Sequence, residues 1–294
     1  MKRKLVQQGS STMMVSLPSK WIKTNQLGKG KEIELEEERN KLVISTDSLQ
    51  KKGVELSLVS NSESYIRTIL TNMYRKGYEK IKINFKDKSS LKIIEDITER
   101  QLIGFEVIKK SEKHCEIENI TEPSKEQFEN IFSKMTMNIE ELFLTTEAFF
   151  QGEKREFEET EDKIKEFDNF CRRITEKEGT ENKELLLFFH SELMHGQRDI
   201  YHLLKFLQKN KSKVGKEELE LLKKSKLMFS LLLEAYKNKK LETIEKIHEL
   251  ETESYKKGYL LLEDKKSNPV VIHHLLNSIR EFYLASSPLT GLAL

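Results

Sequence analysis

Apolar side chains recur every three or four residues from residue 124 almost to the end of the chain, and this periodicity limits the fold more than any other feature. Such spacing puts the apolar side chains on one face of a helix, and that face must be buried. The pattern predicts helices over 124–152, 157–179 and 182–209, a polar break at 210–215, and further helices near 216–238, 240–264 and 269–285. Ser124 and Gln127 have the spacing of a capping box at the first of these helices. The matching lengths on either side of the break predict two similar three-helix bundles in tandem.

A mixture of strands and helices is predicted between residues 48 and 120. Strands are expected at 54–59 and 80–85, and a helix with the capping-box pair Ser60 and Glu63 follows the first of them. A second helix covers about 90–100, and a hairpin at 105–108 and 115–120 closes the region. These elements indicate a separate small α/β domain. It has no glycine-rich loop of the kind that holds phosphate, and the sequence assigns it no function.

The first 46 residues predict a third, smaller domain. Extended segments at 4–8 and 12–17 flank the turn cluster 9–11, and Pro18 opens a short helix over 19–27 that Gly28 should stop. Strands that begin at Ile33 and at Leu42 follow, separated by a turn at 37–40. So short a segment cannot bury its own apolar faces, and we expect it to need a second copy or another domain.

Charge is distributed unevenly along the chain. Residues 1–31 contain seven lysines and arginines and no acidic residue. Because the whole chain carries a net charge of +2, the remaining 263 residues carry −5. A basic end on an otherwise acidic chain points to a polyanionic partner. The alternative is a terminus whose charge only keeps the protein soluble.

Several classes of protein are disfavoured by the composition. No apolar run approaches the roughly 18 residues of a membrane span, and polar residues rather than a hydrophobic signal segment follow the basic N-terminus. Cys115 and Cys171 are the two cysteines, which favours a reducing, cytoplasmic location over a disulfide framework. Cys171 falls on an apolar helix stripe and is expected in the core. No nucleophile elbow or comparable catalytic motif occurs, so we expect no enzymatic activity and no cofactor.

The N-terminal segment resembles the swapped-hairpin domains of the AbrB/MazE/SpoVT type. The resemblance rests on Arg3 to Ser11, on Val15-Ser16-Leu17-Pro18-Ser19-Lys20-Trp21, and on Leu27-Gly28-Lys29-Gly30, and it is closest to the version fused to PhoU-like proteins in archaea. It implies an interlocked homodimer, or a higher homo-oligomer, that binds double-stranded DNA. The residues expected to contact DNA are Lys2, Arg3, Lys4, Gln7, Ser10, Ser11, Thr12, Lys20 and Lys23.

Physical chemistry supports that assignment. Lysine and arginine release counterions when they meet phosphates, and hydroxyl groups fix the register of the protein on DNA. Arg3 is the candidate for a base contact, since its guanidinium can make two bonds to guanine. Trp21 is interpreted as an anchor of the short helix, with base stacking as the alternative. The acidic run 34–38 would repel phosphate and should lie away from the DNA.

The helical region resembles PhoU more weakly, through its length and its three-plus-three helices. That resemblance implies a link with phosphate transport or signalling, and metal clusters held by Glu-x-x-x-Asp motifs. Lys165 stands four residues after Glu161, and Tyr255 four after Glu251, where the motif has aspartate. We therefore predict no metal site, and interpret Glu158, Glu161, Asp162 and Glu251 as a solvated face. His190 and His195, five residues apart, are expected to be packed or surface residues rather than ligands.

The sequence thus predicts an α+β protein with domains at 1–46, 48–120 and 124–285. They are an AbrB-like swapped β-hairpin module, a small α/β unit and PhoU-like tandem bundles. Its expected function is DNA-binding transcription regulation, connected to phosphate uptake or metabolism through the resemblance. The alternatives are an adaptor of a phosphate transporter or signalling kinase that the N-terminal module only dimerises, and a degenerate metalloenzyme.

Overall fold

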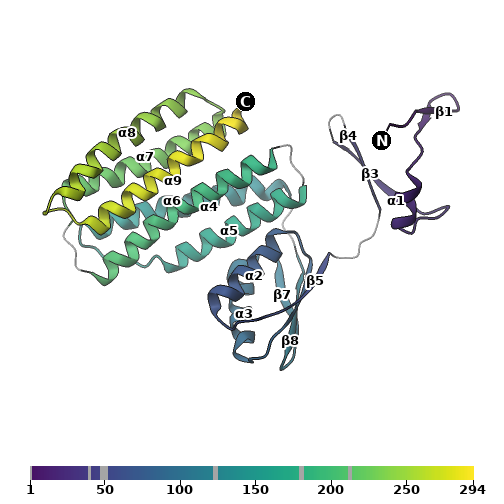
Figure 1. The fold of residues 1–294 in the computed structure, drawn as a ribbon, viewed down its shortest axis with the longest axis horizontal. Coiled ribbons are helices and arrows are strands. Elements are labelled where there is room, and N and C mark those ends of the chain that lie inside the picture. Colours follow the sequence, from purple (N-terminus) through teal and green to yellow (C-terminus); the bar gives the residue numbers. More distant parts are fainter. Residues whose placement is uncertain (1, 39–40, 47–51, 122–124, 179–181, 211–213) are drawn as a thin grey trace. The chain divides into compact units, whose positions relative to one another are not determined.

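The computed structural model describes residues 2–38, 41–46, 52–121, 125–178, 182–210 and 214–294 (Figure 1). The chain divides into two compact units, residues 1–51 and 52–294, and each is described by itself. The fold is α+β, as predicted: hairpins in the first unit, then a four-stranded sheet with helices and a long helical region in the described part of the second.

The first unit contains two short antiparallel hairpins and a helix between them. Strand β1 (Val6–Gln8) pairs with β2 (Thr12–Met14), so that Val6 lies opposite Met14, and Gly9 begins the turn with a φ of +78°. A residue with a side chain would be strained in that conformation. Helix α1 (Ser19–Thr24) follows, and β3 (Ile33–Glu38) pairs with β4 (Lys41–Thr46). These are the elements that the sequence predicts for 1–46.

The prediction that α1 runs to Leu27 and is stopped by Gly28 is wrong. The helix ends at Thr24, and Gln26 takes the left-handed conformation with a φ of 50°. The Leu27 amide then donates to the Ile22 carbonyl and the Gln26 amide to the Lys23 carbonyl, at 3.0 and 3.2 Å. This is the pattern of a Schellman motif, with glutamine in the place that glycine usually holds.

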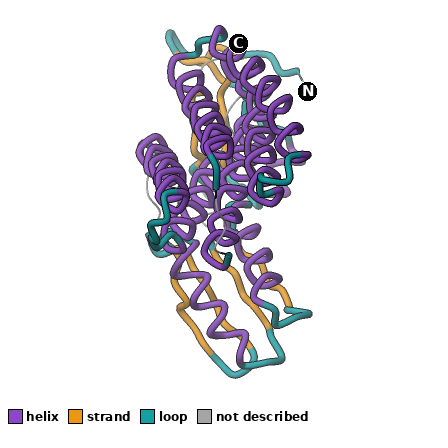
Figure 2. The backbone as a smooth tube through the Cα atoms, turned by 90° about the vertical axis from the view of Figure 1, so that its left-hand side faces the viewer, coloured by secondary structure: helices purple, strands orange, loops and turns teal. Residues whose placement is uncertain are grey.

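A four-stranded sheet of order β5-β6-β8-β7 forms the middle region. Strand β5 (Gly53–Ser57) passes through helix α2 (Glu63–Arg75) into the parallel strand β6 (Lys80–Asn84), and helix α3 (Ser89–Gln101) leads to the hairpin of β7 (Phe105–Lys110) and β8 (His114–Asn119). Helices α2 and α3 pack on the sheet and on each other, and α5 contacts both. Figure 2 shows the backbone from the side, with helices in purple and strands in orange. The order of elements is the predicted one.

The capping residue of α2 differs from the prediction. Ser62, not Ser60, is the N-cap, and its hydroxyl accepts from the Tyr65 amide, while the Ser60 hydroxyl accepts from the Ser62 amide just before the helix. Glu63 is therefore the first helical residue and cannot close the predicted capping box. The apolar side of α2 faces the core of the middle region, because Ile66, Leu70 and Tyr74 are fully buried.

The helical region begins with a 3₁₀ turn at Lys125–Gln127, and the predicted capping residue Ser124 lies outside the described residues. Helices α4 (Phe128–Phe150), α5 (Glu158–Glu178) and α6 (Lys183–Lys209) form one group of three. Helices α7 (Lys216–Asn238), α8 (Glu242–Glu263) and α9 (Pro269–Ala293) form the other. Apolar side chains of both groups join in one continuous core, which also contains Cys171.

The two groups meet mainly along α6 and α9. A Cβ atom added at Gly196 of α6 would lie 2.5 Å from the ring of Phe282 on α9, so only glycine permits this approach. Helix α9 also continues to Ala293, past the predicted end at residue 285. Although Pro288 costs the helix a hydrogen bond, it and Leu289 are buried, and this packing maintains the last two turns.

Arg173 of α5 joins the helical region to the middle region and is fully buried. Its Nη1 donates to the carbonyl oxygens of Tyr74 and Tyr78 at 2.8 and 2.9 Å, where α2 ends, and its Nη2 lies 3.3 Å from a carboxylate oxygen of Glu79. The guanidinium also stacks over the rings of Tyr74 and Phe105, 4.9 Å from each centroid. A cation at the C-terminal end of a helix is favoured by the helix dipole. One side chain thus satisfies the end of α2 and fixes it against α5.

None of the helices in the described part of the chain has the length and apolar character that crossing a membrane requires.

Substitution of Arg173 by Met should lower the free energy of unfolding by about 2–4 kcal/mol, because two carbonyl oxygens each lose a charged donor and Glu79 loses a cationic partner. The measurement is a urea titration followed by circular dichroism. Arg155→Met is the matched control, since Arg155 pairs with Glu153 at 3.0 Å on the surface, and it should change the free energy by less than about 0.5 kcal/mol. Equal effects of the two substitutions would contradict the role given to Arg173.

Candidate nucleic-acid interface

The predicted DNA-contacting residues come from three segments of the first unit. Lys2, Arg3 and Lys4 form an arm before β1. Gln7 lies in β1, and Ser10, Ser11 and Thr12 occupy the turn and the first position of β2. Lys20 and Lys23 are three residues apart on α1, a spacing that puts both on one side of the helix.

All nine of these side chains are exposed to solvent. They form no ion pair with another side chain that the structure describes, so their charges and hydroxyl groups are available to a partner. The acidic run 34–38 lies in β3, which belongs to a different two-stranded sheet from β1 and β2. The acidic strand β3 therefore does not pair with either strand of the basic hairpin β1-β2.

The first unit lacks a core of its own, since none of its described residues is buried. Its apolar side chains are exposed instead; the largest exposed fractions are those of Leu5 (66%), Met13 (61%), Leu42 (59%), Leu35 (58%) and Val6 (57%). Trp21, the predicted helix anchor, is half-buried. Isolated apolar side chains on a surface are ordinary, but a module with no buried residue is incomplete as a single copy.

Comparison with known proteins agrees with this description. Residues 6–52 match the family described as antidote-toxin recognition MazE, bacterial antitoxin. The N-terminal module is therefore a MazE/AbrB-like domain, as its sequence predicts. No curated protein and no solved structure matches the chain. Because the family match ends at residue 52, the resemblance of the helical region to PhoU stays a prediction.

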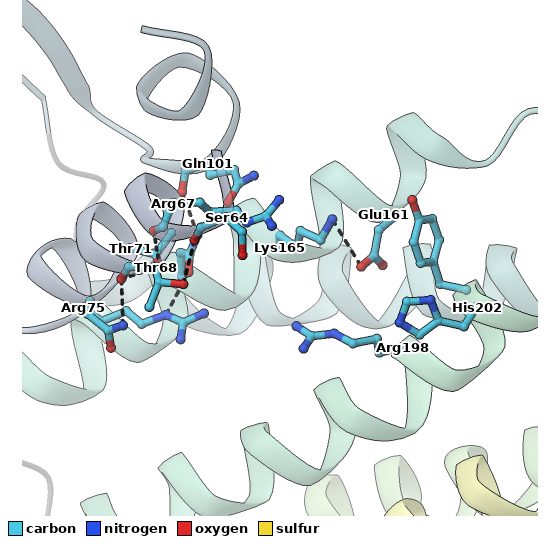
Figure 3. A pocket seen from close by; sticks show the side chains of 13 residues that line it. Ser64, Arg67, Thr68, Thr71, Arg75, Gln101, Glu161, Lys165, Arg198 and His202 are labelled. Atoms are coloured by element: carbon cyan, nitrogen blue, oxygen red, sulfur yellow. Dashed lines mark hydrogen bonds and ion pairs between the residues drawn. The ribbon is translucent and has the colours of Figure 1, made fainter. Parts of the chain in front are cut away.

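Glu161 and Lys165 stand where the PhoU-type resemblance implies the first Glu-x-x-x-Asp metal motif, and the structure shows how they contact each other. Lys165 Nζ lies 3.4 Å from a carboxylate oxygen of Glu161 and 3.7 Å from one of Asp162, on α5 (Figure 3). Glu161 is buried, so its assignment to a solvated face is wrong. Burial raises the pKa of Glu161, and the nearby Lys165 ammonium opposes that shift. The ammonium thus stands beside the carboxylate where the motif would have a second carboxylate and a metal ion.

Glu251 and Tyr255 on α8 stand where the resemblance implies the second metal motif, and both side chains have partners on α9. Arg280 Nη1 lies 3.0 Å from a carboxylate oxygen of Glu251, and the Tyr255 hydroxyl donates to the Leu276 carbonyl at 3.3 Å. Both partners belong to α9, and they tie α8 to it.

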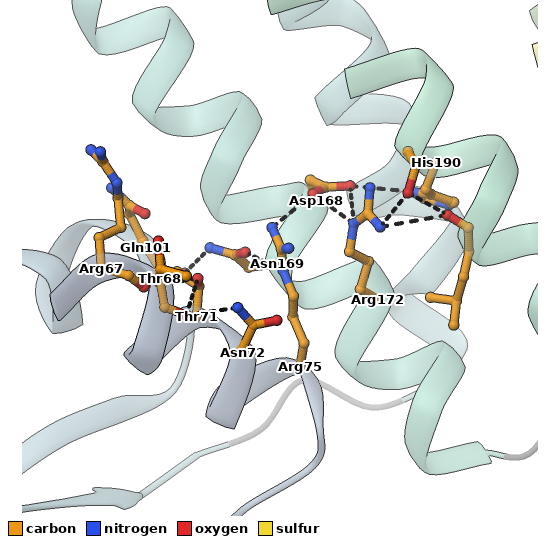
Figure 4. Close-up of polar contacts among 12 residues, drawn as sticks. Arg67, Thr68, Thr71, Asn72, Arg75, Gln101, Asp168, Asn169, Arg172 and His190 are labelled. Carbon is orange, nitrogen blue, oxygen red and sulfur yellow. Dashed lines mark hydrogen bonds and ion pairs between the residues drawn. The ribbon is translucent and has the colours of Figure 1, made fainter. Parts of the chain in front are cut away.

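A buried ionic cluster surrounds Asp168 of α5 (Figure 4). Its carboxylate lies 2.8 Å from Arg172 Nε, 3.2 Å from Arg75 Nη2 of α2 and 3.6 Å from His190 Nδ1 of α6. Burial alone would raise the pKa of Asp168, but the two arginines and His190 hold it well below its usual range. Burial lowers the pKa of His190, which confirms it as a packed histidine.

The sequence analysis missed one group of side chains on α6 and α9. Among the described residues, Glu192, His195 and Glu281 bring one ligand atom each within 4.8 Å of one another. A histidine and two carboxylates are ligands that zinc and other divalent cations accept, and three is the number that catalytic zinc sites use. The Glu-x-x-His spacing of Glu192 and His195 is visible in the sequence, but Glu281 comes from a helix almost ninety residues later.

Glu192 and Glu281 repel each other when both are ionised. Burial, followed by the hydrogen bond and charge of Glu281, raises the pKa of Glu192 to about 7. At a pH between 4.5, the ordinary pKa of a glutamate, and about 7, Glu192 is protonated in the folded protein and ionised in the unfolded chain. The free energy of unfolding should therefore fall as the pH rises through this interval.

Substitution of Glu192 by Gln removes that titration and keeps the shape of the side chain. We expect the variant to exceed the unsubstituted protein in free energy of unfolding by about 1–3 kcal/mol at pH 8, and the difference to vanish near pH 4.5. Urea titrations across the pH range measure it. Glu249→Gln, on the exposed side of α8, is the control and should leave the pH profile unchanged. A Glu192→Gln variant that is less stable than the unsubstituted protein at pH 8 would show that the carboxylate is held ionised by a favourable partner.

Proposed function

We propose that this protein is a DNA-binding transcription regulator whose MazE/AbrB-like module meets the DNA. The observation that carries the proposal is the exposed, acid-free basic segment of that module: all seven cations of residues 1–31 are exposed. Domains of this type commonly bind DNA and dimerise, which supports the proposal. The protein would act by binding, without catalysing a reaction, and in the cytoplasm.

The chemistry of the segment suits a duplex. Lysine and arginine side chains that reach phosphates release counterions, and this release gives affinity without sequence preference. The hydroxyl groups of Ser10, Ser11 and Thr12 suit phosphate contacts that fix the register. Arg3 is the side chain that we assign to a base, because its planar guanidinium matches the two acceptors of guanine.

A second copy of the module would complete this surface. The exposed apolar side chains of both hairpins would be buried between copies, and each cationic contact would occur twice. The proposed link with phosphate uptake rests on the resemblance of the helical region to PhoU. An adaptor that uses the module only for dimerisation is the alternative, and DNA binding distinguishes the two.

Removal of residues 1–46 should convert the dimer into a monomer, because the exposed apolar faces that need a partner lie in that segment. Sedimentation velocity of the full chain and of the shortened chain measures the change. Circular dichroism should show that the shortened chain keeps its helices, since the described members of the cores of residues 52–294 all belong to the second unit. A shortened chain that remains dimeric would place the dimer contact in the helical region.

Duplex binding should fall by about a thousandfold or more between 50 and 200 mM salt, as expected for about six to ten neutralised phosphates. Lys4→Ala should weaken binding to all sequences alike and make the salt dependence shallower by about one unit per lost contact. Arg3→Ala should cost about 1–3 kcal/mol, mainly at one base position. Fluorescence anisotropy of a labelled duplex across a salt series measures all three effects.

Lys216→Ala is the control, because Lys216 is an exposed lysine at the start of α7 and should not affect DNA binding. Binding that ignores salt, or that survives the joint loss of Lys2, Arg3 and Lys4, would favour the adaptor over the regulator.

A further inference from the structure

A cavity of about 510 Å³ lies between the middle region and the helical region, inside the second unit. Helix α2 provides one wall, and α5 and α6 provide the other (Figure 3). This volume is in the range of sites for small organic ligands, and it exceeds what a single inorganic ion needs.

The walls of the cavity are predominantly cationic. Arg67 and Arg75 line it from α2, Lys165 from α5 and Arg198 from α6, and Glu161 is the acidic residue among the described lining side chains. The charge of Glu161 is already balanced by Lys165 at 3.4 Å. The remaining lining residues are polar or aromatic, so an anion that entered would meet an excess of positive charge.

Arg198 differs from the other cations of the cavity. Arg67 pairs with Glu63 at 2.8 Å, and Arg75 pairs with Asp168 at 3.2 Å. Arg198 makes no hydrogen bond or ion pair with any residue in the part of the chain that the structure describes. Its guanidinium extends from α6 toward the side chains of α2 across the cavity (Figure 3). The N–H donors of this guanidinium therefore have no acceptor among the described residues.

Arg75 and Arg198 approach from opposite walls and repel each other. Burial lowers the pKa of Arg75, Asp168 opposes this effect, and the charges of Arg172 and Arg198 add to the lowering. An anion between the two guanidiniums would relieve this repulsion. The geometry of the cavity thus favours a negatively charged group at its centre.

We propose that this cavity binds a phosphorylated small molecule, with its phosphoryl group between Arg198 of α6 and Arg75 of α2. A carboxylate has its two acceptor oxygens in one plane and carries a single negative charge. A phosphoryl group has oxygens on several sides and carries close to two charges, so it can accept from guanidiniums on facing walls. The Ser64 hydroxyl and the Asn72 amide of α2 lie in the same lining.

The space beyond the phosphoryl group is lined by Tyr201 and His202 of α6. Burial and the neighbouring His274 lower the pKa of His202, so at neutral pH its ring is an uncharged donor and acceptor. The phenol ring of Tyr201 and the imidazole of His202 could contact the organic part of a phosphorylated metabolite whose phosphoryl group is bound by the arginines. A ligand placed there would contact both regions of the second unit and hold α2 against α6.

Isothermal titration calorimetry of the full chain with inorganic phosphate, pyrophosphate, adenosine monophosphate and adenosine triphosphate tests the proposal at constant ionic strength. We expect at least one of these to bind, and Arg198→Gln to weaken it about tenfold to a hundredfold, as for a lost charge-assisted hydrogen bond. Tighter binding of the nucleotides than of phosphate would identify an organic ligand, and equal binding would identify the free anion.

Two controls separate this site from the basic N-terminal arm. Lys209→Gln removes one positive charge from an exposed position on the same helix and should leave the affinity unchanged. The joint substitution of Lys2, Arg3 and Lys4 by Ala should also leave it unchanged, although it would abolish DNA binding. The proposal is overturned if no probe binds up to about 10 mM, or if Arg198→Gln has no more effect than Lys209→Gln.

Discussion

The second unit depends on a guanidinium buried where a helix ends. Carbonyl oxygens at the end of α2 cannot find donors within the helix, and the amides of Lys76, Gly77 and Tyr78 donate to some of them. Arg173 adds a donor to the Tyr74 carbonyl, bonds the Tyr78 carbonyl just beyond the helix and pairs with Glu79, while its guanidinium stacks on the rings of Tyr74 and Phe105. A buried charge is tolerated only when it is paired and hydrogen-bonded in this way. The orientation of the middle region on the helical region follows from this arrangement.

The same orientation determines the polar chemistry nearby. Once the end of α2 is fixed by Arg173, Arg75 on the same helix reaches Asp168, and the earlier turns of α2 stand opposite α5 and α6 across a cavity. Arg75 of α2 and Arg198 of α6 then face each other across the cavity, and helix packing holds them there although their charges repel. Arg75 is paired with Asp168, but Arg198 has no ion pair with a described residue, and a cation left in this state is a feature of binding sites more than of structural interfaces.

The elements of this fold were predictable from the sequence because their signals are local. Apolar spacing predicted the helices of residues 128–293 to within a few residues except at the end of α9, and turn residues predicted the hairpins. The errors have local causes too: Gln26 ends α1 in a conformation usually left to glycine, and tertiary packing carries α9 through Pro288. The cavity and the trio of Glu192, His195 and Glu281 could not be predicted, because their members come from helices far apart in the chain.

None of the described residues of the first unit is buried, so the homodimer that we propose would link the order of this unit to the amount of protein present. A module that obtains its core from a second copy is stabilised by association, so its folded fraction rises with chain concentration. At low concentration the association of two chains is a second-order process, and halving the chain concentration lowers the dimer population more than twofold. A regulator built on such a module would respond to its own abundance as a threshold, and dilution alone would be enough to release it from DNA.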